Sequence, residues 1–259
     1  MPTAHAEGCP DTEVVFARGT TEEPGVGPTG DDFVNALRTR VAPKSVGVYG
    51  VDYPATTAFS TAIDGINDAR THILTTAANC PKTKMVLGGF SQGAAVIGFV
   101  TASAVPDGVS AADVPAPMPP EVADHVAAVA LFGKPSTRFM RAINDPPVTI
   151  GPQYVVKTID LCVDNDLVCD LHGSSFSAHN QYDELGLVDQ GASYVASQLQ
   201  ASWAADALAT DAQAAPSALA ASSSAAAGAA PSPHLPPQPL PAPGPPATVA
   251  PLPPTGPLT

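Results

Sequence analysis

A serine lies between two glycines in the segment Gly89-Phe90-Ser91-Gln92-Gly93. An apolar run from Lys84 precedes it, and a run of small residues typical of a helix follows it. This context favours a nucleophile elbow, in which the glycines permit a sharp strand-to-helix turn that exposes the serine hydroxyl. The amino end of the helix would bring the Gln92 backbone N–H to a developing oxyanion. The alternative is a tight turn in which Ser91 only caps the helix.

A serine hydroxyl needs a general base, and the base needs an acid that orients it. Both residue types occur in one later segment, which runs from Cys162 to Tyr182. Its acids include Asp164 and Asp166, and its histidines are His172 and His179. The order serine, acid, histidine is that of the α/β-hydrolases. Residue chemistry and spacing do not distinguish between the two acids or between the two histidines.

The elements that must position these residues alternate along the chain. Strands are predicted at about 14–16, 46–53, 84–90, 126–132 and 154–161, and helices at about 29–41, 59–78, 92–102 and 191–208. The central strands are apolar almost throughout, as expected for a parallel sheet covered on both faces. We therefore predict a doubly wound α/β fold with a mainly parallel five-stranded sheet. Its ligand site is expected at the carboxyl ends of the strands.

The last part of the chain has a different composition. From Ala212 to Thr259 there is no Asp, Glu, Lys or Arg, and 14 of the 30 prolines lie there. Such a segment cannot offset its ordering entropy with an apolar core. We predict a disordered Ala/Ser/Pro-rich tail at 209–259, one catalytic domain at 9–208, and a residual leader at 1–8. We predict the leader because Ala4-His5-Ala6 has the form of a signal-peptidase site.

The four cysteines predict two disulfides and an oxidising compartment. No two of them form a Cys-x-x-Cys pair, which argues against a zinc or redox site. Three pairings are possible, and proximity in sequence favours Cys162–Cys169, which leaves Cys9–Cys80. The protein is therefore expected to be secreted, and to be extracellular or associated with the cell wall.

The formal net charge is −13, and the residues from 212 onward contribute none of it. Nucleic acids and anionic membranes attract clusters of Lys and Arg, so neither is an expected partner of this acidic domain. No apolar run reaches the roughly 18 residues of a membrane span. We expect a monomer that uses neither a metal nor a cofactor.

Several motifs in fixed order resemble the cutinase family. The segment from Val15 to Glu22 is similar to the family's first-strand motif, and the elbow is similar to its Gly-Tyr-Ser-Gln-Gly, with Phe90 in place of the commoner tyrosine. The late segment fits the family pattern at Cys162, Asp166, Cys169, His179 and Tyr182. Cys9 and Cys80 stand where the family's other disulfide is expected. The resemblance covers Cys9 to about Leu199.

This resemblance implies individual roles. It selects Asp166 and His179 as the partners of Ser91, and it places Thr20 in the oxyanion hole beside the Gln92 N–H. It implies a lidless serine esterase that forms an acyl-enzyme. The implied substrates are esters of short- to medium-chain acids, cutin-like polyesters or some lipids.

Two other functions are possible. A phospholipase, lysophospholipase or thioesterase would use the same site residues with a different acyl pocket. A non-catalytic, wall-associated module would depend on the Pro-rich tail, and the complete set of site residues disfavours it. Four apolar residues near the histidines could form a substrate rim or simply pack the loop: Leu167, Val168, Leu171 and Phe176.

Overall fold

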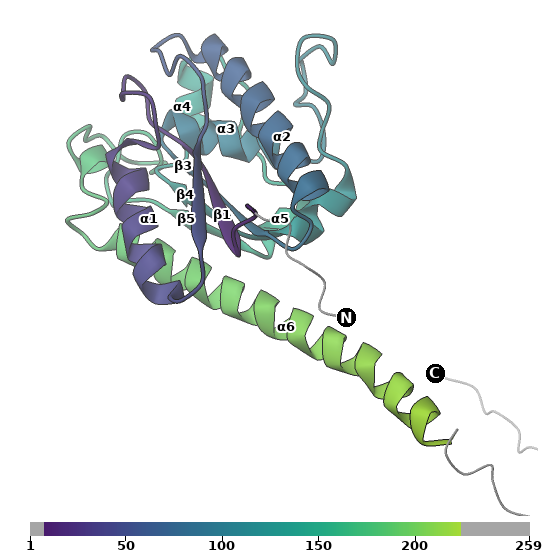
Figure 1. Cartoon of the computed structure of the whole chain (residues 1–259). Helices are drawn as coiled ribbons and strands as arrows, with labels where there is room; N and C mark the ends of the chain where they lie inside the picture. The colour runs from purple at the N-terminus through teal and green to yellow at the C-terminus, as the bar shows by residue number, and fades with distance from the viewer. Residues whose placement is uncertain (1–7, 224–259) are drawn as a thin grey trace, which may run out of the picture. The chain divides into compact units, whose positions relative to one another are not determined.

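Five parallel strands form one sheet in the order β2-β1-β3-β4-β5. They are β1 (Thr12–Ala17), β2 (Val46–Gly50), β3 (Lys84–Phe90), β4 (Val126–Phe132) and β5 (Thr158–Leu161). Figure 1 shows the sheet flanked by helices. The computed structural model describes residues 8–223, with side chains as far as Thr210. The predicted doubly wound, five-stranded α/β fold is confirmed.

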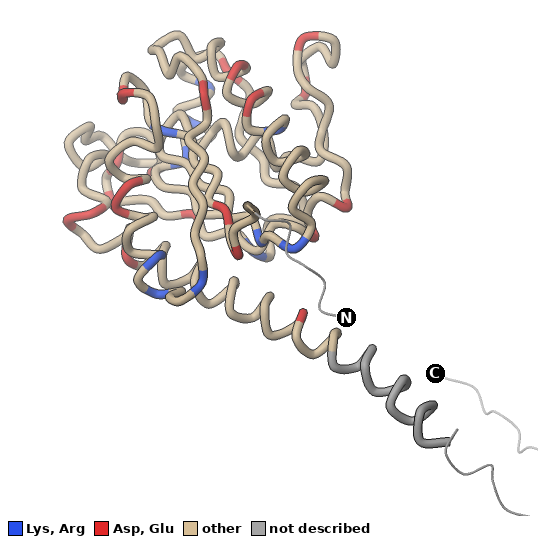
Figure 2. Tube along the Cα trace, in the orientation of Figure 1, with Lys and Arg blue, Asp and Glu red and all other residues tan. Residues whose placement is uncertain are grey.

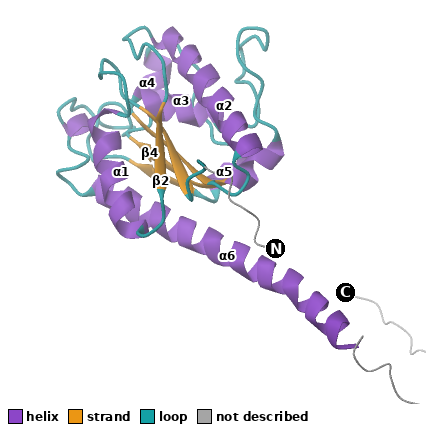
Figure 3. Ribbon diagram, viewed as in Figure 1, coloured by secondary structure: helices purple, strands orange, loops and turns teal. Residues whose placement is uncertain are grey.

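Helices cover both faces of the sheet (Figure 3). α1 (Gly27–Val41) and the first part of α6 (Leu187–Ser223) pack on one face, and α2 (Ala62–Asn79) and α3 (Gln92–Val100) pack on the other. Side chains alternate along each strand, so Phe16 of β1 enters the first core and Val15 enters the second. The shorter helical elements are η1 (Phe59–Thr61), η2 (Pro120–His125), α4 (Thr137–Ala142), α5 (Pro152–Val155) and η3 (Ala178–Asn180).

The predicted bounds differ most from the structure at two elements. The run predicted as a strand at 154–161 begins with the last residues of α5, because Pro152 at the helix start has a backbone angle suited to a helix. Helix α6 is longer than the predicted 191–208, since alanine dominates the sequence after Leu208 and has the highest helix propensity. The chain divides into units at 1–211 and 212–259. Most of the predicted leader, and the predicted tail from residue 224, lie outside the described residues.

Both predicted disulfides are present. Cys9–Cys80 joins the segment before β1 to the residue that follows α2. Cys162–Cys169 closes a short loop directly after β5. The first bridge therefore lies at the amino ends of the strands, and the second lies at their carboxyl ends.

Acidic residues outnumber basic ones along the described chain, as the colours of Figure 2 show. Two of the basic residues form ion pairs with α6: Arg40 with Asp189 at 3.1 Å and Lys84 with Asp206 at 2.8 Å. Both aspartates are well exposed, so each pair contributes at most about 1 kcal/mol. Of the helices described, none is both long and apolar enough to cross a membrane.

Candidate active site

Ser91 lies where the strand order of the sheet reverses. It follows β3 and precedes α3, and the reversal falls between β1 and β3. The carboxyl ends of two such strands border a crevice in which ligands bind. Ser91 has φ 55° and ψ −118°, a conformation that a residue with a side chain rarely adopts. This backbone strain agrees with the elbow predicted from the sequence.

The two glycines of the elbow are required by close contacts between backbone segments. A Cβ atom on Gly89 would collide with the Gly93 carbonyl group. A Cβ atom on Gly93 would collide with the carbonyl groups of Ala17 and Arg18. The start of α3 therefore packs directly against the chain that leaves β1. That chain holds Thr20, the residue expected in the oxyanion hole.

The structure pairs Asp166 with His179. His179 Nδ1 lies 2.7 Å from Asp166 Oδ2, and the two residues are 4 % and 0 % exposed. Asp164 and His172, which residue chemistry alone could not rule out, are both exposed. The geometry thus favours the same acid and histidine that the family resemblance selects.

Asp166 receives further hydrogen bonds from its surroundings. The Val168 backbone N–H donates to Oδ1 at 2.7 Å, and the Tyr182 hydroxyl donates to Oδ2 at 2.7 Å. Burial raises the pKa of Asp166, but the hydrogen bonds from His179, Tyr182 and Val168 outweigh burial and hold the pKa below its ordinary value. The carboxylate is therefore ionised at neutral pH. The family resemblance singled out Tyr182 as an aromatic position, but it did not reveal the hydrogen bond to Asp166.

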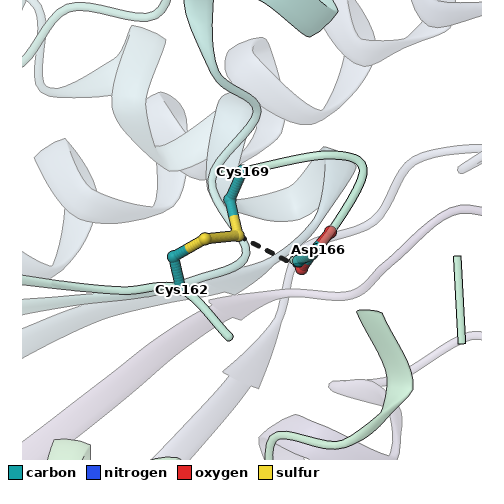
Figure 4. A group of neighbouring side chains, drawn as sticks. All are labelled: Cys162, Asp166 and Cys169. Atoms are coloured by element: carbon teal, nitrogen blue, oxygen red, sulfur yellow. Dashed lines mark hydrogen bonds between the residues drawn. A yellow bond between two sulfur atoms is a disulfide. The ribbon is translucent and has the colours of Figure 1, made fainter. Parts of the chain in front are cut away.

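The Cys162–Cys169 disulfide encloses the loop that carries Asp166 (Figure 4). Cys169 Sγ lies 3.1 Å from Asp166 Oδ2. A sulfur atom in a disulfide carries no proton, so this is a packing contact and not a donated hydrogen bond. The donor atoms of the three residues lie within 4.8 Å of one another, but metal binding by cysteine requires a thiolate, which neither bridged sulfur can supply.

His179 lies beside the elbow, although no hydrogen bond joins it to Ser91. The Phe90 ring stacks on the imidazole, with 4.9 Å between the ring centroids. The Ser91 backbone N–H donates to the Phe132 carbonyl, and a Cβ atom on the adjacent Gly133 would lie 2.8 Å from His179 Cε1. His179 Nε2 is buried and has no hydrogen-bond partner among the described residues. This nitrogen is available to a hydroxyl group, and catalytic hydrogen bonds commonly tighten only when substrate binds.

Thr20 lies in a turn that is fixed by its neighbours. The Gly19 N–H donates to Glu22 Oε2 at 2.7 Å, and Arg18 Nε donates to the Glu22 carbonyl at 2.8 Å. Arg18 is 3 % exposed. Burial raises the pKa of Glu22, and the opposing Gly19 hydrogen bond and Arg18 charge do not cancel the effect. These contacts hold Thr20 in place at the carboxyl end of β1.

The side chain of Gln92 is completely buried at the start of α3. Its Nε2 donates to the Thr56 carbonyl at 2.9 Å. This bond ties the first residue of α3 to the segment that leads into η1. The Gln92 backbone N–H, predicted to stabilise an oxyanion, is thereby fixed at the helix amino end, where the helix dipole favours negative charge.

An apolar cavity of about 200 Å³ lies between α2, α3, α4 and the segment that follows α3. Ala95, one helical turn after Ser91, lines it together with Phe59 of η1 and Met140 of α4. Few polar side chains border it, and these are Ser60, Arg70 and Asp145. No local sequence pattern indicates this cavity, because its walls come from segments far apart in the chain.

The four residues suggested as a substrate rim fall into two groups. Leu171 and Phe176 are 55 % and 61 % exposed, and the Phe176 ring centroid is 5.9 Å from that of His179. Val168 is only 2 % exposed, so it packs the loop and does not form a rim. Leu167 is partly buried. The exposed apolar surface beside His179 therefore centres on Phe176.

Comparison with known proteins gives consistent results. Residues 8–199 match the family model described as Cutinase. The Mycobacterium tuberculosis protein named "Probable carboxylesterase Culp5" is 60 % identical over 169 residues, which are 65 % of this chain and 96 % of that protein. "Phospholipase Culp4" of the same organism is 48 % identical over 198 residues, 76 % of this chain and 82 % of the relative.

Solved structures share the fold. A Trichoderma reesei cutinase in complex with a C11Y4 phosphonate inhibitor aligns with a TM-score of 0.57 and 28 % identity over 74 % of this chain and 77 % of that one. An acetylxylan esterase aligns with a TM-score of 0.60 and 22 % identity over 74 % and 99 %, and it supports the fold alone. The fold and these relatives together define a carboxylic ester hydrolase of the α/β-hydrolase type. Within that class, the chain belongs to the cutinase family.

Proposed function

We propose that the protein hydrolyses carboxylic esters through an acyl-enzyme, with Ser91 as nucleophile, His179 as general base and Asp166 as the orienting acid. The observation that carries the proposal is the buried Asp166–His179 pair beside a strained elbow serine. An ionised carboxylate on Nδ1 holds the imidazole in the tautomer whose Nε2 can accept a proton. Nε2 is the atom that lacks a partner among the described residues.

The reaction takes two steps. Ser91 Oγ attacks the ester carbonyl carbon while His179 Nε2 takes the hydroxyl proton, and the tetrahedral intermediate then expels the alcohol with that proton. Water attacks the acyl-enzyme as His179 takes one of its protons, and the same proton returns to Ser91 when the acid leaves. Thr20 and the Gln92 N–H stabilise the oxyanion in both steps.

The substrates that we propose are esters of aliphatic acids. The exposed ring of Phe176 gives the surface beside His179 an affinity for apolar groups, and Leu171 of the same loop is also exposed. The apolar cavity that Ala95 helps to line, one helical turn from Ser91, can receive a hydrocarbon chain, because its walls are almost entirely apolar. The similarity to a protein named as a phospholipase makes phospholipids a second candidate substrate.

A panel of esters tests the proposal. Chromogenic esters of increasing acyl length, a phospholipid and a thioester should be assayed with wild-type protein and with Ser91→Ala. Ser91→Ala should lower kcat by a factor on the order of 10⁶ if this site resembles other serine triads. Asp166→Asn and His179→Ala should each be crippling, whereas Asp164→Asn and His172→Ala, at the exposed positions, are matched controls that should have little effect.

The panel also separates the alternatives. Preferential cleavage of the phospholipid or thioester would reassign the substrate while leaving the mechanism intact. No hydrolysis of any compound by wild-type protein would favour a non-catalytic, wall-associated module. Activity of Ser91→Ala within tenfold of wild type would overturn the serine mechanism.

We further propose that the protein is secreted and acts as a monomer. Its two disulfides support secretion, because such bonds persist in oxidising compartments. Fractionation of cells and medium tests the location, and light scattering coupled to size-exclusion chromatography tests the monomer. Recovery only in the cytosol, or a mass near twice that of the chain, would contradict these expectations.

A further inference from the structure

The hydroxyl of Tyr182 is a fourth group at the acid–base pair. It donates to Asp166 Oδ2 at 2.7 Å, and this is the same oxygen that lies 2.7 Å from His179 Nδ1. Tyr182 is 2 % exposed, so water does not compete for the carboxylate on this side. We propose that Tyr182 is a positioning residue that sets both the orientation and the charge of Asp166. This inference rests on the catalytic roles proposed above.

The direction of the hydrogen bond follows from the groups around the hydroxyl. An ionised carboxylate only accepts, so the tyrosine must donate its single proton to it. The Val163 backbone N–H donates to the hydroxyl oxygen at 3.4 Å, and Cys169 Sγ, at 3.2 Å, has no proton to offer. Burial, the Asp166 hydrogen bond and the Asp166 charge all raise the pKa of Tyr182. The hydroxyl therefore remains a donor throughout the neutral range.

The ring of Tyr182 is fixed by its packing. It makes edge-on contacts with the rings of Phe90, Phe132 and His179, at centroid distances of 5.5, 6.4 and 6.1 Å. Its backbone carbonyl accepts the N–H of Leu187, the first residue of α6, at 2.9 Å. The tyrosine thus connects the acid to both the elbow strand and the last helix, and its hydroxyl cannot turn away without disturbing that packing.

This arrangement has two consequences for Asp166. With Val168 N–H on Oδ1 and Tyr182 on Oδ2, the carboxylate cannot rotate, so Oδ2 stays directed at His179. The hydrogen bond from the tyrosine also disperses negative charge on Oδ2, which weakens the attraction between that oxygen and a protonated imidazole. Without the hydroxyl, the protonated and catalytically inactive form of the pair persists to higher pH.

Tyr182→Phe tests the inference, because it removes the hydroxyl and keeps the ring. We expect kcat for a soluble ester to fall about tenfold with little change in KM, since the interaction matters most when charge develops on the imidazole. We also expect the acidic limb of the kcat/KM profile to move up by about half a pH unit or more. Tyr154→Phe is a matched control: Tyr154 is 5 % exposed, and its hydroxyl has no hydrogen-bond partner among the described residues. Tyr154→Phe should change neither kcat nor the position of the acidic limb.

An unchanged acidic limb in a folded Tyr182→Phe variant would overturn the inference, even if activity fell, because general loosening of the loop lowers kcat without moving the limb. A second measurement uses wild-type protein and does not depend on the variant. The Tyr182 hydroxyl proton and the His179 Nδ1 proton should both resonate downfield in proton NMR and show a mutual nuclear Overhauser effect. An Nδ1 signal with no neighbouring hydroxyl signal would also overturn the inference. If Ser91→Ala remained active, the proposed mechanism would fail, and this NMR result would still decide the hydrogen bond.

Discussion

Gly133 provides a direct test of how tightly the histidine must be held. It follows β4 with φ +62°, a backbone angle at which alanine is less stable than glycine by about 1–2 kcal/mol. A Cβ atom there would lie 2.8 Å from both His179 Cε1 and Tyr182 Oη. Ordinary contact begins at 3.4 Å, so the imidazole would have to move by about 0.6 Å. Because a 1 Å misplacement can cost on the order of 10²-fold in rate, we expect Gly133→Ala to lower kcat by about 10- to 100-fold.

Gly186 is the matched control for this substitution. It has a similar backbone angle, φ +74°, but nothing lies within 4 Å of the Cβ position. Gly186→Ala should therefore lose only the backbone contribution, about 1–2 kcal/mol of unfolding free energy, and should keep full activity. Gly133→Ala should lose about 1–3 kcal/mol more because of overpacking.

Urea unfolding and kcat/KM for a soluble ester, measured well below both melting temperatures, give the two quantities. The comparison with Gly186→Ala removes the effect of the positive backbone angle. If Gly133→Ala retained activity within about twofold of Gly186→Ala, the histidine would tolerate displacement. Catalysis would then not depend on the exact position of the imidazole.

Three further predictions concern stability. Replacing Cys162 and Cys169 with serine should lower the unfolding free energy by about 2.5 kcal/mol through loop entropy, and should lower kcat in the folded protein because the bridge restrains Asp166. An unchanged kcat at a lower Tm would show that the loop keeps its conformation without the disulfide. Burial raises the pKa of Glu13, but hydrogen bonds from His72 and Thr76 lower it below its ordinary value overall. The ionised carboxylate therefore stabilises the fold fully above about pH 4.5, and this contribution is lost as the pH falls. Glu13→Gln should therefore flatten the decline of Tm between about pH 5 and pH 3, and an unaltered decline would contradict this. Deleting 212–259 should shift Tm by less than about 4 °C and leave kcat/KM unchanged, since that segment is poor in large apolar residues. A larger shift in Tm would mean that the segment packs on the catalytic domain.

The sequence by itself determined the order of strands and helices and the candidate nucleophile, Ser91. Local signals suffice for these features, because an apolar run followed by Gly-x-Ser-x-Gly and small residues specifies a strand, a turn and a helix through short-range sterics. The composition of the cysteines likewise predicted two disulfides, and both are present. The order of acids and histidines was readable, but residue chemistry alone did not distinguish Asp164 from Asp166, which lie two residues apart; only the resemblance to the cutinase family selected Asp166 and His179.

Tertiary structure decided what depends on residues distant in sequence. Burial separates Asp166 from Asp164 and His179 from His172, and no local pattern encodes which side of a loop faces the core. The hydrogen bond from Tyr182 spans 16 residues, and the apolar cavity joins walls from three helices. The acid–histidine pair and its tyrosine form only when the sheet brings the ends of β3, β4 and β5 side by side, because register and packing, rather than propensity, fix the distances between them.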